Sequence, residues 1–126
     1  MHRLKERTEE FLKATSQLER AVQQPKDEFI RDSVIQRFEF SYELSWKMLK
    51  LKLEEEGLEA RTPRQVFQES LVAGFIQDGN LWSELQKQRN LTTHTYDESL
   101  AESVYQFIAE QGLALFQQLA CVAKQW

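Results

Sequence analysis

The sequence predicts an all-α protein: an antiparallel bundle of about five helices, with four helices in an up-and-down core and one short helix beside it. Apolar residues recur at steps of three and four almost throughout the chain, which is the spacing of one helix face. No segment alternates between apolar and polar residues as a half-buried strand does, and no Asn-Gly hairpin turn is present. A chain of 126 residues has the length of one ordinary domain. Residues 1–126 are therefore expected to form a single helical domain.

The first two helices are expected on either side of Pro25. In the first, residues 3–22, one face carries Leu4, Phe11, Thr15, Leu18 and Val22. The second begins at Asp27, a good N-cap, and ends near residue 56, where Gly57 followed by Leu58 resembles a glycine C-cap with its apolar neighbour. This is the longest helix, and we expect it at the centre of the fold.

The second helix carries two apolar stripes on roughly opposite sides when its residues are placed at about 100° per step. One stripe comprises Phe38, Tyr42, Trp46, Leu49 and Leu53, and the other comprises Phe40, Leu44, Met48 and Leu51. A helix that is apolar over more than half of its circumference must be buried on more than one side. Either the first and last helices cover both stripes, or the second stripe forms a subunit interface, which is the favoured interpretation.

The remaining three helices follow from capping signals. Thr62, Pro63 and Gln65 form a capping box with proline at the first helical position, and this third helix ends at Gly74. The fourth helix is expected from about residue 78 to 90. The last starts at residue 96 or 97, with residues 95–98 as its capping box, and continues to about residue 122.

Composition and charge narrow the class of function. The net charge of -4 argues against broad, charge-driven binding of nucleic acid, so any RNA contact should be local or assembled across subunits. No apolar run is long enough for a bilayer and no secretion leader is visible, so we expect a soluble cytoplasmic protein without a membrane partner. The lone Cys121 is interpreted as a small core residue. Two histidines and one cysteine give no zinc spacing, and no glycine-rich phosphate loop is present, so no metal and no cofactor are expected.

The segment RNLTTHTYDE, residues 89–98, carries the candidate chemistry. Arg89 offers a planar cation that matches phosphate oxygens, and His94 titrates near neutral pH. A short junction between the last two helices should bring these two residues and Tyr96 together, next to a helix N-terminus that favours an anion. His94 could then take a proton from a ribose 2′-hydroxyl or protonate a leaving 5′-oxygen, while Arg89 stabilises the phosphate. The structural alternative is that Arg89 caps a helix end, His94 is an exposed turn residue and Tyr96 packs on the bundle.

Other conspicuous side chains have a structural interpretation. Glu39 and Glu43 are expected in a solvated strip, with Glu43 paired to Lys47 one turn later, and a place in the site is the less favoured alternative. Trp46 and Trp82 are expected in the core rather than as platforms for stacked bases.

Three segments carry a resemblance to a known family: residues 32–50 (DSVIQRFEFSYELSWKMLK), 62–76 (TPRQVFQESLVAGFI) and 81–98 (LWSELQKQRNLTTHTYDE). The chain resembles the HEPN superfamily, and within it the nucleotidyltransferase substrate-binding proteins. Arg89, Asn90 and His94 match the HEPN ribonuclease signature of an arginine, a polar residue and a histidine four to six positions on. The ending His-x-Tyr is similar to that of HEPN toxins paired with minimal nucleotidyltransferase (MNT) antitoxins, and Tyr96 occupies the position of their AMP acceptor.

The resemblance implies a helical bundle that forms a homodimer or a larger assembly, with two Arg-His motifs facing each other across a cleft. It implies an MNT-type nucleotidyltransferase as partner and RNA or a nucleotide as substrate. Under the favoured interpretation the chain is the toxin of a toxin–antitoxin pair. It would be a metal-independent endoribonuclease with Arg89 and His94 as catalytic residues, silenced by AMP transfer to Tyr96. The alternatives are a non-catalytic substrate-binding subunit of a nucleotidyltransferase and a helical adaptor without any site.

Overall fold

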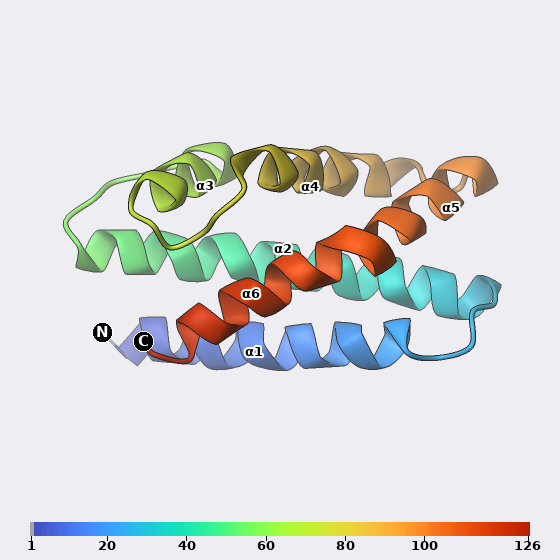
Figure 1. The fold of residues 1–126 in the computed structure, drawn as a ribbon, viewed down its shortest axis with the longest axis horizontal. Coiled ribbons are helices and arrows are strands. Elements are labelled where there is room, and N and C mark those ends of the chain that lie inside the picture. The colour runs from blue at the N-terminus through green and yellow to red at the C-terminus, as the bar shows by residue number, and fades with distance from the viewer. Residues whose placement is uncertain (1) are drawn as a thin grey trace.

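The computed structural model describes residues 2–126, and these residues fold into helices without any strand (Figure 1). The helices are α1 (His2–Val22), α2 (Glu28–Glu55), α3 (Pro63–Val72), α4 (Gly79–Leu91), α5 (Glu98–Phe107) and α6 (Leu113–Ala123). A 3₁₀ turn, η1 (Thr92–His94), follows α4, and a π-helical turn, η2 (Ile108–Gly112), joins α5 to α6. The predicted all-α bundle is confirmed, with α5, η2 and α6 together forming the expected last helix.

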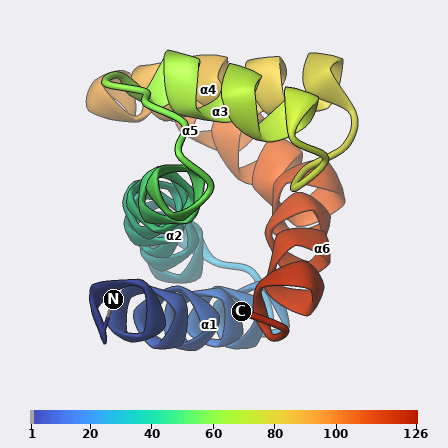
Figure 2. The same ribbon diagram turned by 90° about the vertical axis from the view of Figure 1, so that its left-hand side faces the viewer.

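The long helix α2 lies at the centre, as expected, and contacts α1, α3, α4, α5 and α6. Helix α1 lies antiparallel to α2 on one side, while α3 and α4 form a layer on the opposite side (Figures 1 and 2). The last helix starts near the end of α4 and crosses diagonally to pack against α1. This arrangement brings the end of α4 and the start of α5 to the N-terminal half of α2.

The cap residues explain where α2 and α3 begin and end. The Asp27 carboxylate accepts a hydrogen bond from the Ile30 amide, and α2 closes at Gly57, which has a φ of 77°. Helix α3 has the predicted capping box between Thr62 and Gln65, and its C-terminal Gly74 has a φ of 84°. Only glycine adopts these left-handed conformations without a steric cost, so both predicted glycine stops are confirmed.

The start of the last helix differs from the expected capping box at residues 95–98. Asp97 is the N-cap, and its carboxylate accepts from the Leu100 amide. The Thr95 hydroxyl instead donates to the Thr92 carbonyl at 3.1 Å, because the chain continues as a 3₁₀ turn beyond α4. The α-helix therefore begins only at Glu98.

Aromatic contacts join four helices in the core. The Phe116 ring of α6 lies 6.0 Å from that of Phe11 in α1, 5.8 Å from that of Phe38 in α2 and 6.1 Å from that of Trp82 in α4. All four side chains are buried, so Trp82 is the core residue that the sequence predicted. Each such ring buries a large apolar area, and this burial stabilises the fold.

The second apolar stripe of α2 is mostly covered by the chain itself. Met48 is fully buried in the core, and the partly buried Leu44 and Leu51 pack against the core. Phe40 is different, because 51% of its surface is exposed. The expectation that the whole second stripe forms a subunit interface is therefore wrong, because Met48 is buried by the chain's own helices and Phe40 is the exposed member of the stripe.

Cys121 is exposed, which corrects its interpretation as a core residue. Its neighbour Ala120 and the nearby Leu119 and Ala123 point into the core, which leaves Cys121 on the outer side of α6. In the part of the chain that the structure describes, no helix combines the length and apolar character needed to cross a bilayer.

Candidate active site at the end of helix α4

Arg89 lies in the last turn of α4 and is held in place by groups from two helices. Its Nη1 donates to the Thr92 hydroxyl at 3.2 Å, its Nη2 lies 3.5 Å from a Glu43 oxygen, and its guanidinium carbon lies 5.7 Å from the centre of the Tyr42 ring. The Arg89 side chain is 24% exposed, and its Nε is buried without a hydrogen-bond partner. The guanidinium is therefore anchored on one side and accessible on the other, and it does not cap helix carbonyls as the structural alternative proposed.

Glu39 and Glu43 reach this site, which corrects their expected place in a solvated strip. Arg89 Nη1 lies 4.0 Å from Glu39 Oε2, and Glu43 also accepts a hydrogen bond from the Trp46 indole at 3.0 Å. No ion pair joins Glu43 to Lys47 in the described part of the chain. The correction has a topological cause: α4 packs directly over this face of α2, and the sequence does not reveal which face a later helix will cover.

Tyr42 forms the apolar wall behind Arg89. Burial raises the pKa of its phenol above the usual value of 10.0, the charge of Glu43 adds to this, and Arg89 opposes it. A phenol with a raised pKa stays neutral at physiological pH. The buried Tyr42 ring therefore gives the Arg89 guanidinium a packing surface.

His94 and Tyr96 lie at the helix junction and both point outward. The His94 Nδ1 is 3.3 Å from the Tyr96 hydroxyl, and the two rings meet edge to face with centroids 6.0 Å apart. His94 is exposed, and Tyr96 is 83% exposed, so Tyr96 does not pack on the bundle. The structure thus places the two side chains in contact, while no hydrogen bond links either of them to Arg89 within residues 2–126.

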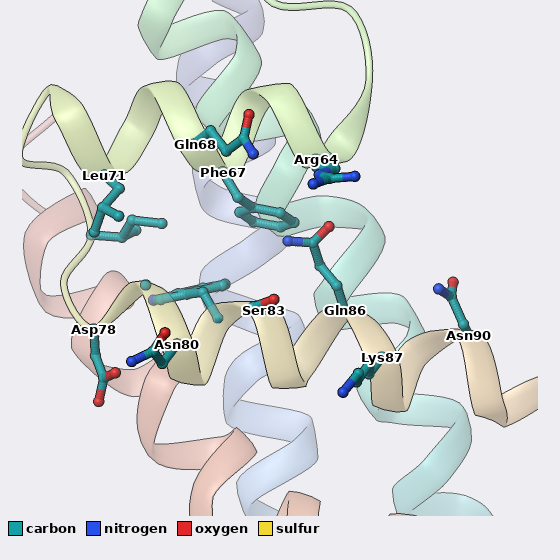
Figure 3. Close-up of a pocket in the computed structure, with 13 residues that line it drawn as sticks. Arg64, Phe67, Gln68, Leu71, Asp78, Asn80, Ser83, Gln86, Lys87 and Asn90 are labelled. Atoms are coloured by element: carbon teal, nitrogen blue, oxygen red, sulfur yellow. The ribbon is translucent and has the colours of Figure 1, made fainter.

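Asn90 faces away from Arg89, into a groove between α3 and α4. Because successive helix positions differ by about 100°, Arg89 faces α2 while Asn90 lines this separate groove. The groove has a volume of about 710 Å³, and Figure 3 shows its side chains from both helices. Sequence reasoning identified Asn90 but missed the groove, because its other residues form no motif.

The N-terminus of α5 is not an open anion site. The Asp97 carboxylate already caps it, and Glu98 lies in its first turn. These two acids occupy the position that was expected to attract a phosphate. Arg89 is consequently the cation of the α4–α5 junction that can bind a phosphate.

A buried arginine on α2 fixes the position of this junction. Arg31 is 4% exposed, and its Nη1 lies 2.6 Å from Glu98 and 3.2 Å from Glu102, both in α5. The hydrogen bond to Glu98 is the largest of the effects that raise the pKa of Arg31, against the opposing effect of burial. The start of α5 is therefore tied to the start of α2, which holds His94 and Tyr96 close to α2.

Two exposed aromatic side chains, Phe29 and Tyr96, line a second hollow at the junction. This hollow, of about 590 Å³, is lined by those two rings together with Thr95 and further residues of α2, which are Asp32, Ser33, Ile35, Gln36 and Glu39. Phe29 is 77% exposed, and Phe40 is exposed on the same helix three turns further along. Large exposed aromatics that lie together are typical of a surface that binds a partner.

The geometry can support phosphoryl chemistry with an anchored cation and an exposed imidazole. Arg89 keeps N–H groups for phosphate oxygens, and the exposed His94 imidazole can contact a bound substrate. Among the described residues, no three His, Cys, Asp or Glu side chains lie close enough together to hold a metal ion.

Comparison with known proteins places the chain in a family. The sequence pattern of the family described as "nucleotidyltransferase substrate binding protein like" matches residues 6–124. A curated relative, the "probable ribonuclease HepT" of Haemophilus influenzae, is 37% identical over 92 residues, which cover 66% of this chain and 63% of the relative. The chain thus spans somewhat less than two thirds of that protein.

Two solved structures are similar over nearly the whole chain. A protein from Thermus thermophilus aligns with a TM-score of 0.81 and 31% identity, covering 89% of this chain and 97% of the other. A protein from Haemophilus influenzae, described as showing the fold of a substrate binding domain of a nucleotidyltransferase, aligns with a TM-score of 0.72 and 28% identity, covering 98% of each chain. The family match, the relative and the shared fold confirm the resemblance carried by residues 32–50, 62–76 and 81–98. This chain belongs to the nucleotidyltransferase substrate binding protein-like family, which has the HEPN-like helical fold.

Proposed function

We propose that this protein is a metal-independent endoribonuclease that pairs with a nucleotidyltransferase and is switched off by AMP transfer to Tyr96. One observation carries the proposal: the Tyr96 hydroxyl lies 3.3 Å from Nδ1 of the exposed His94 imidazole. A modification of this hydroxyl would directly obstruct the proposed catalytic base. The relative's name, a ribonuclease, supports the same chemistry.

The proposed reaction uses the 2′-hydroxyl of the RNA itself. His94 accepts the proton of this hydroxyl while the 2′-oxygen attacks the adjacent phosphorus, and the bond from phosphorus to the 5′-oxygen breaks. The products are a 2′,3′-cyclic phosphate and a 5′-hydroxyl, whose proton comes from a second acid. Arg89 stabilises the negative charge on the phosphate oxygens during the attack.

A homodimer would supply the second acid. In this proposal two copies place their Arg89 and His94 side chains on opposite sides of one RNA phosphate, so that one His94 acts as base and the other as acid. The exposed Phe29, which lines the hollow with Tyr96, and the exposed Phe40 further along α2 support an apolar contact between copies. A paired site also concentrates cations locally in a chain with a net charge of -4.

The proposed switch attaches AMP to Tyr96. The phenol gives up its proton to a base of the partner nucleotidyltransferase, and its oxygen attacks the α-phosphorus of ATP. The bond from that phosphorus to the oxygen that bridges to the β-phosphorus breaks, and pyrophosphate leaves. Tyr96 is 83% exposed, so an enzyme can reach it without unfolding the bundle. The attached phosphodiester would add a negative charge and a bulky nucleoside beside His94, which would exclude an RNA phosphate from the site.

RNA cleavage tests the catalytic part of the proposal. The purified wild-type chain should cut single-stranded RNA in the presence of EDTA, and His94→Ala should reduce the rate by about 10² to 10⁴, the usual contribution of a general base. Because His94 is exposed, this variant should keep its thermal midpoint and helical content. Intact RNA at high protein concentration would contradict the proposal.

Intact mass tests the switch. After coexpression with an MNT-type nucleotidyltransferase, the chain should gain the mass of one or more AMP units, and Tyr96→Phe should prevent the gain. Tyr105→Phe, on α5 further from the site, is the matched control and should be modified normally. An unchanged mass of the wild-type chain would oppose an AMP switch.

A non-catalytic role is the second candidate. The family description and the Haemophilus influenzae structure both refer to substrate binding for a nucleotidyltransferase. Under this alternative the chain binds the enzyme and its substrate, Arg89 holds a phosphate, and no RNA is cut. His94→Ala would then leave both complex formation and substrate transfer unchanged, whereas the ribonuclease proposal requires a loss of cleavage.

A further inference from the structure

We propose that the groove between α3 and α4 binds the single-stranded RNA that is delivered to Arg89 and His94. This inference rests on the proposed ribonuclease function, and it assigns the surface that holds the strand next to the cleaved phosphate. Its volume of about 710 Å³ lies within the range of about 300–1,000 Å³ that is typical of ligand sites.

The groove is built by facing rows of side chains from the two helices. On α3, Arg64, Phe67, Gln68 and Leu71 follow the spacing of one helix face. On α4, Ser83, Gln86, Lys87 and Asn90 do the same. Figure 3 shows Arg64 opposite Gln86, with Asn90 further along α4 at the same end of the groove.

Two cations of the groove are available to bind phosphate. Arg64 and Lys87 line it, and neither forms an ion pair or a side-chain hydrogen bond in the described part of the chain. By contrast, Lys26, Arg31 and Arg89 are all engaged by carboxylates. Two free cations in one hollow of an acidic chain favour a negatively charged ligand.

The carboxamides favour RNA over an acidic peptide. Gln68, Asn80, Gln86 and Asn90 line the groove, and each amide offers both donors and an acceptor. Base edges present donors and acceptors together and match both ends of such an amide, whereas the acidic side chains of a peptide only accept. Beneath the groove lies a stacked pair of buried rings, Phe67 and Trp82, with centroids 5.1 Å apart, which fixes the spacing of α3 and α4.

One end of the groove lies at the end of α4 that carries Arg89, although Arg89 itself faces α2. Its acidic residue, Asp78, caps the start of α4, whereas Lys87 and Asn90 lie in the last turns of that helix. Asn90 is adjacent in sequence to Arg89, which faces α2 from the same turn. A strand whose phosphates contact Arg64 and Lys87 would therefore pass Asn90 on its way to the junction that carries His94.

Binding of a non-cleavable RNA analogue tests this groove. The probe is a fluorescent 2′-O-methylated single strand of about 12 nucleotides, a length within the range of single-strand sites, and it lacks the attacking hydroxyl. The double variant Arg64→Gln with Lys87→Gln should bind the probe about tenfold more weakly at fixed salt. The steepness with which the logarithm of the binding constant falls with the logarithm of the salt concentration should decrease by about 1.4, or about 0.7 for each lost phosphate contact. Gln68→Glu with Gln86→Glu, which keeps the side-chain shapes, should weaken binding similarly by repelling phosphates.

The matched control changes the same charge elsewhere. Lys13→Gln with Arg20→Gln removes two cations from α1, on the side of the bundle opposite to α3 and α4 (Figure 2). This control should bind within about twofold of the wild-type chain, because no phosphate contact is lost. Circular dichroism should show the same helical content for all variants, because every substituted side chain of these pairs lies on the surface or lines the open groove.

The outcomes separate this inference from the proposed function. If the wild-type chain cuts RNA but the groove variants bind like the control, the groove assignment is overturned and the ribonuclease stands. If the chain binds the probe through the groove but cuts no RNA, the groove assignment stands and the catalytic proposal fails. If no form binds the probe, or if the groove variants lose only the nucleotidyltransferase, the groove serves another ligand and the assignment is overturned.

Discussion

At the residue scale, the site depends on how one arginine is held. Arg89 contacts Thr92 on its own segment, Glu43 on α2 and the Tyr42 ring, and these contacts fix a planar group at one orientation. A lysine in its place would keep the charge but could not make several directional contacts at once. The position of the cation, rather than its charge alone, should therefore determine the reaction rate.

Arg89→Lys tests this directly. We expect the rate of RNA cleavage to fall by about 10- to 100-fold, because the ammonium group loses the fork geometry that matches phosphate oxygens. The thermal midpoint should change little, since the lysine keeps the charge near Glu43. Single-turnover rates with excess enzyme provide the measurement, and a variant with the wild-type rate would show that any cation suffices.

The sequence predicted the positions of some residues of this site but not of others. The spacing of Arg89, His94 and Tyr96 is visible in the chain, and the short junction predicted that all three lie close together. Among the described residues His94 and Tyr96 are in contact, and no hydrogen bond joins Arg89 to either. Glu39 and Glu43 were misplaced, because their charge and spacing fit a solvated strip equally well. Only the packing of α4 on α2 decides between the two positions, and this packing depends on contacts between residues far apart in sequence.

At the scale of the elements, Arg31 and its acids attach α5 to α2. Glu102 of this cluster accepts from Lys26 and Arg31, and these hydrogen bonds, that of Lys26 first, lower the pKa of its carboxyl from the usual 4.5. When a carboxyl has a lower pKa in the folded state than in the unfolded state, its charge stabilises the fold at pH values above the unfolded-state pKa. This contribution is lost as the pH falls through the folded value.

The pH dependence of unfolding tests this link. Glu102→Gln should lower the thermal midpoint relative to wild type at about pH 6 to 7, and the difference should shrink toward zero below the usual carboxyl pKa, as the wild-type group becomes protonated. The matched control is Glu9→Gln, an exposed acid on α1 without an ion pair among the described residues. A difference that persisted unchanged at about pH 3 would contradict the role of this charge.

Helix boundaries show what local sequence determines. Asp27, Gly57, Thr62 and Gly74 act where the sequence predicted, because caps and left-handed glycines are local chemistry. The 3₁₀ turn η1 and the π turn η2 were not predicted. At η2, a Cβ on Gly112 would lie 3.2 Å from the Phe107 ring, so the packing of a neighbouring side chain favours glycine there. That contact has no signature in the helical periodicity.

At the scale of the whole molecule, the bundle leaves one aromatic surface open beside its candidate site. Phe29 and Phe40 on α2 and Tyr96 at the junction are all more than half exposed. The periodicity of α2 predicted too much uncovered surface, because it could not show that Met48 is buried by the chain's own helices. It nevertheless indicated the region where the proposed contact between copies lies.

Phe40→Glu tests this contact. The wild-type chain should form a dimer with twice the 14.9 kDa of one copy, and the variant should be a monomer, because a charge would be buried without a partner. Val72→Glu is the matched control, since Val72 is an exposed apolar residue of α3 away from this surface, and it should stay dimeric. Light scattering after gel filtration gives the mass, and a dimer that survives in Phe40→Glu would place the interface elsewhere.

The chemistry of the RNA ends tests the central claim most directly. When a 5′-labelled single strand is cut by the wild-type chain in EDTA, the products should carry 2′,3′-cyclic phosphates and 5′-hydroxyls, since the attacking oxygen belongs to the ribose beside His94. The same ends should be absent from reactions with His94→Ala and with the chain carrying AMP on Tyr96. Products with 3′-hydroxyl ends, or equal cleavage by the wild-type and His94→Ala chains, would contradict catalysis by this site.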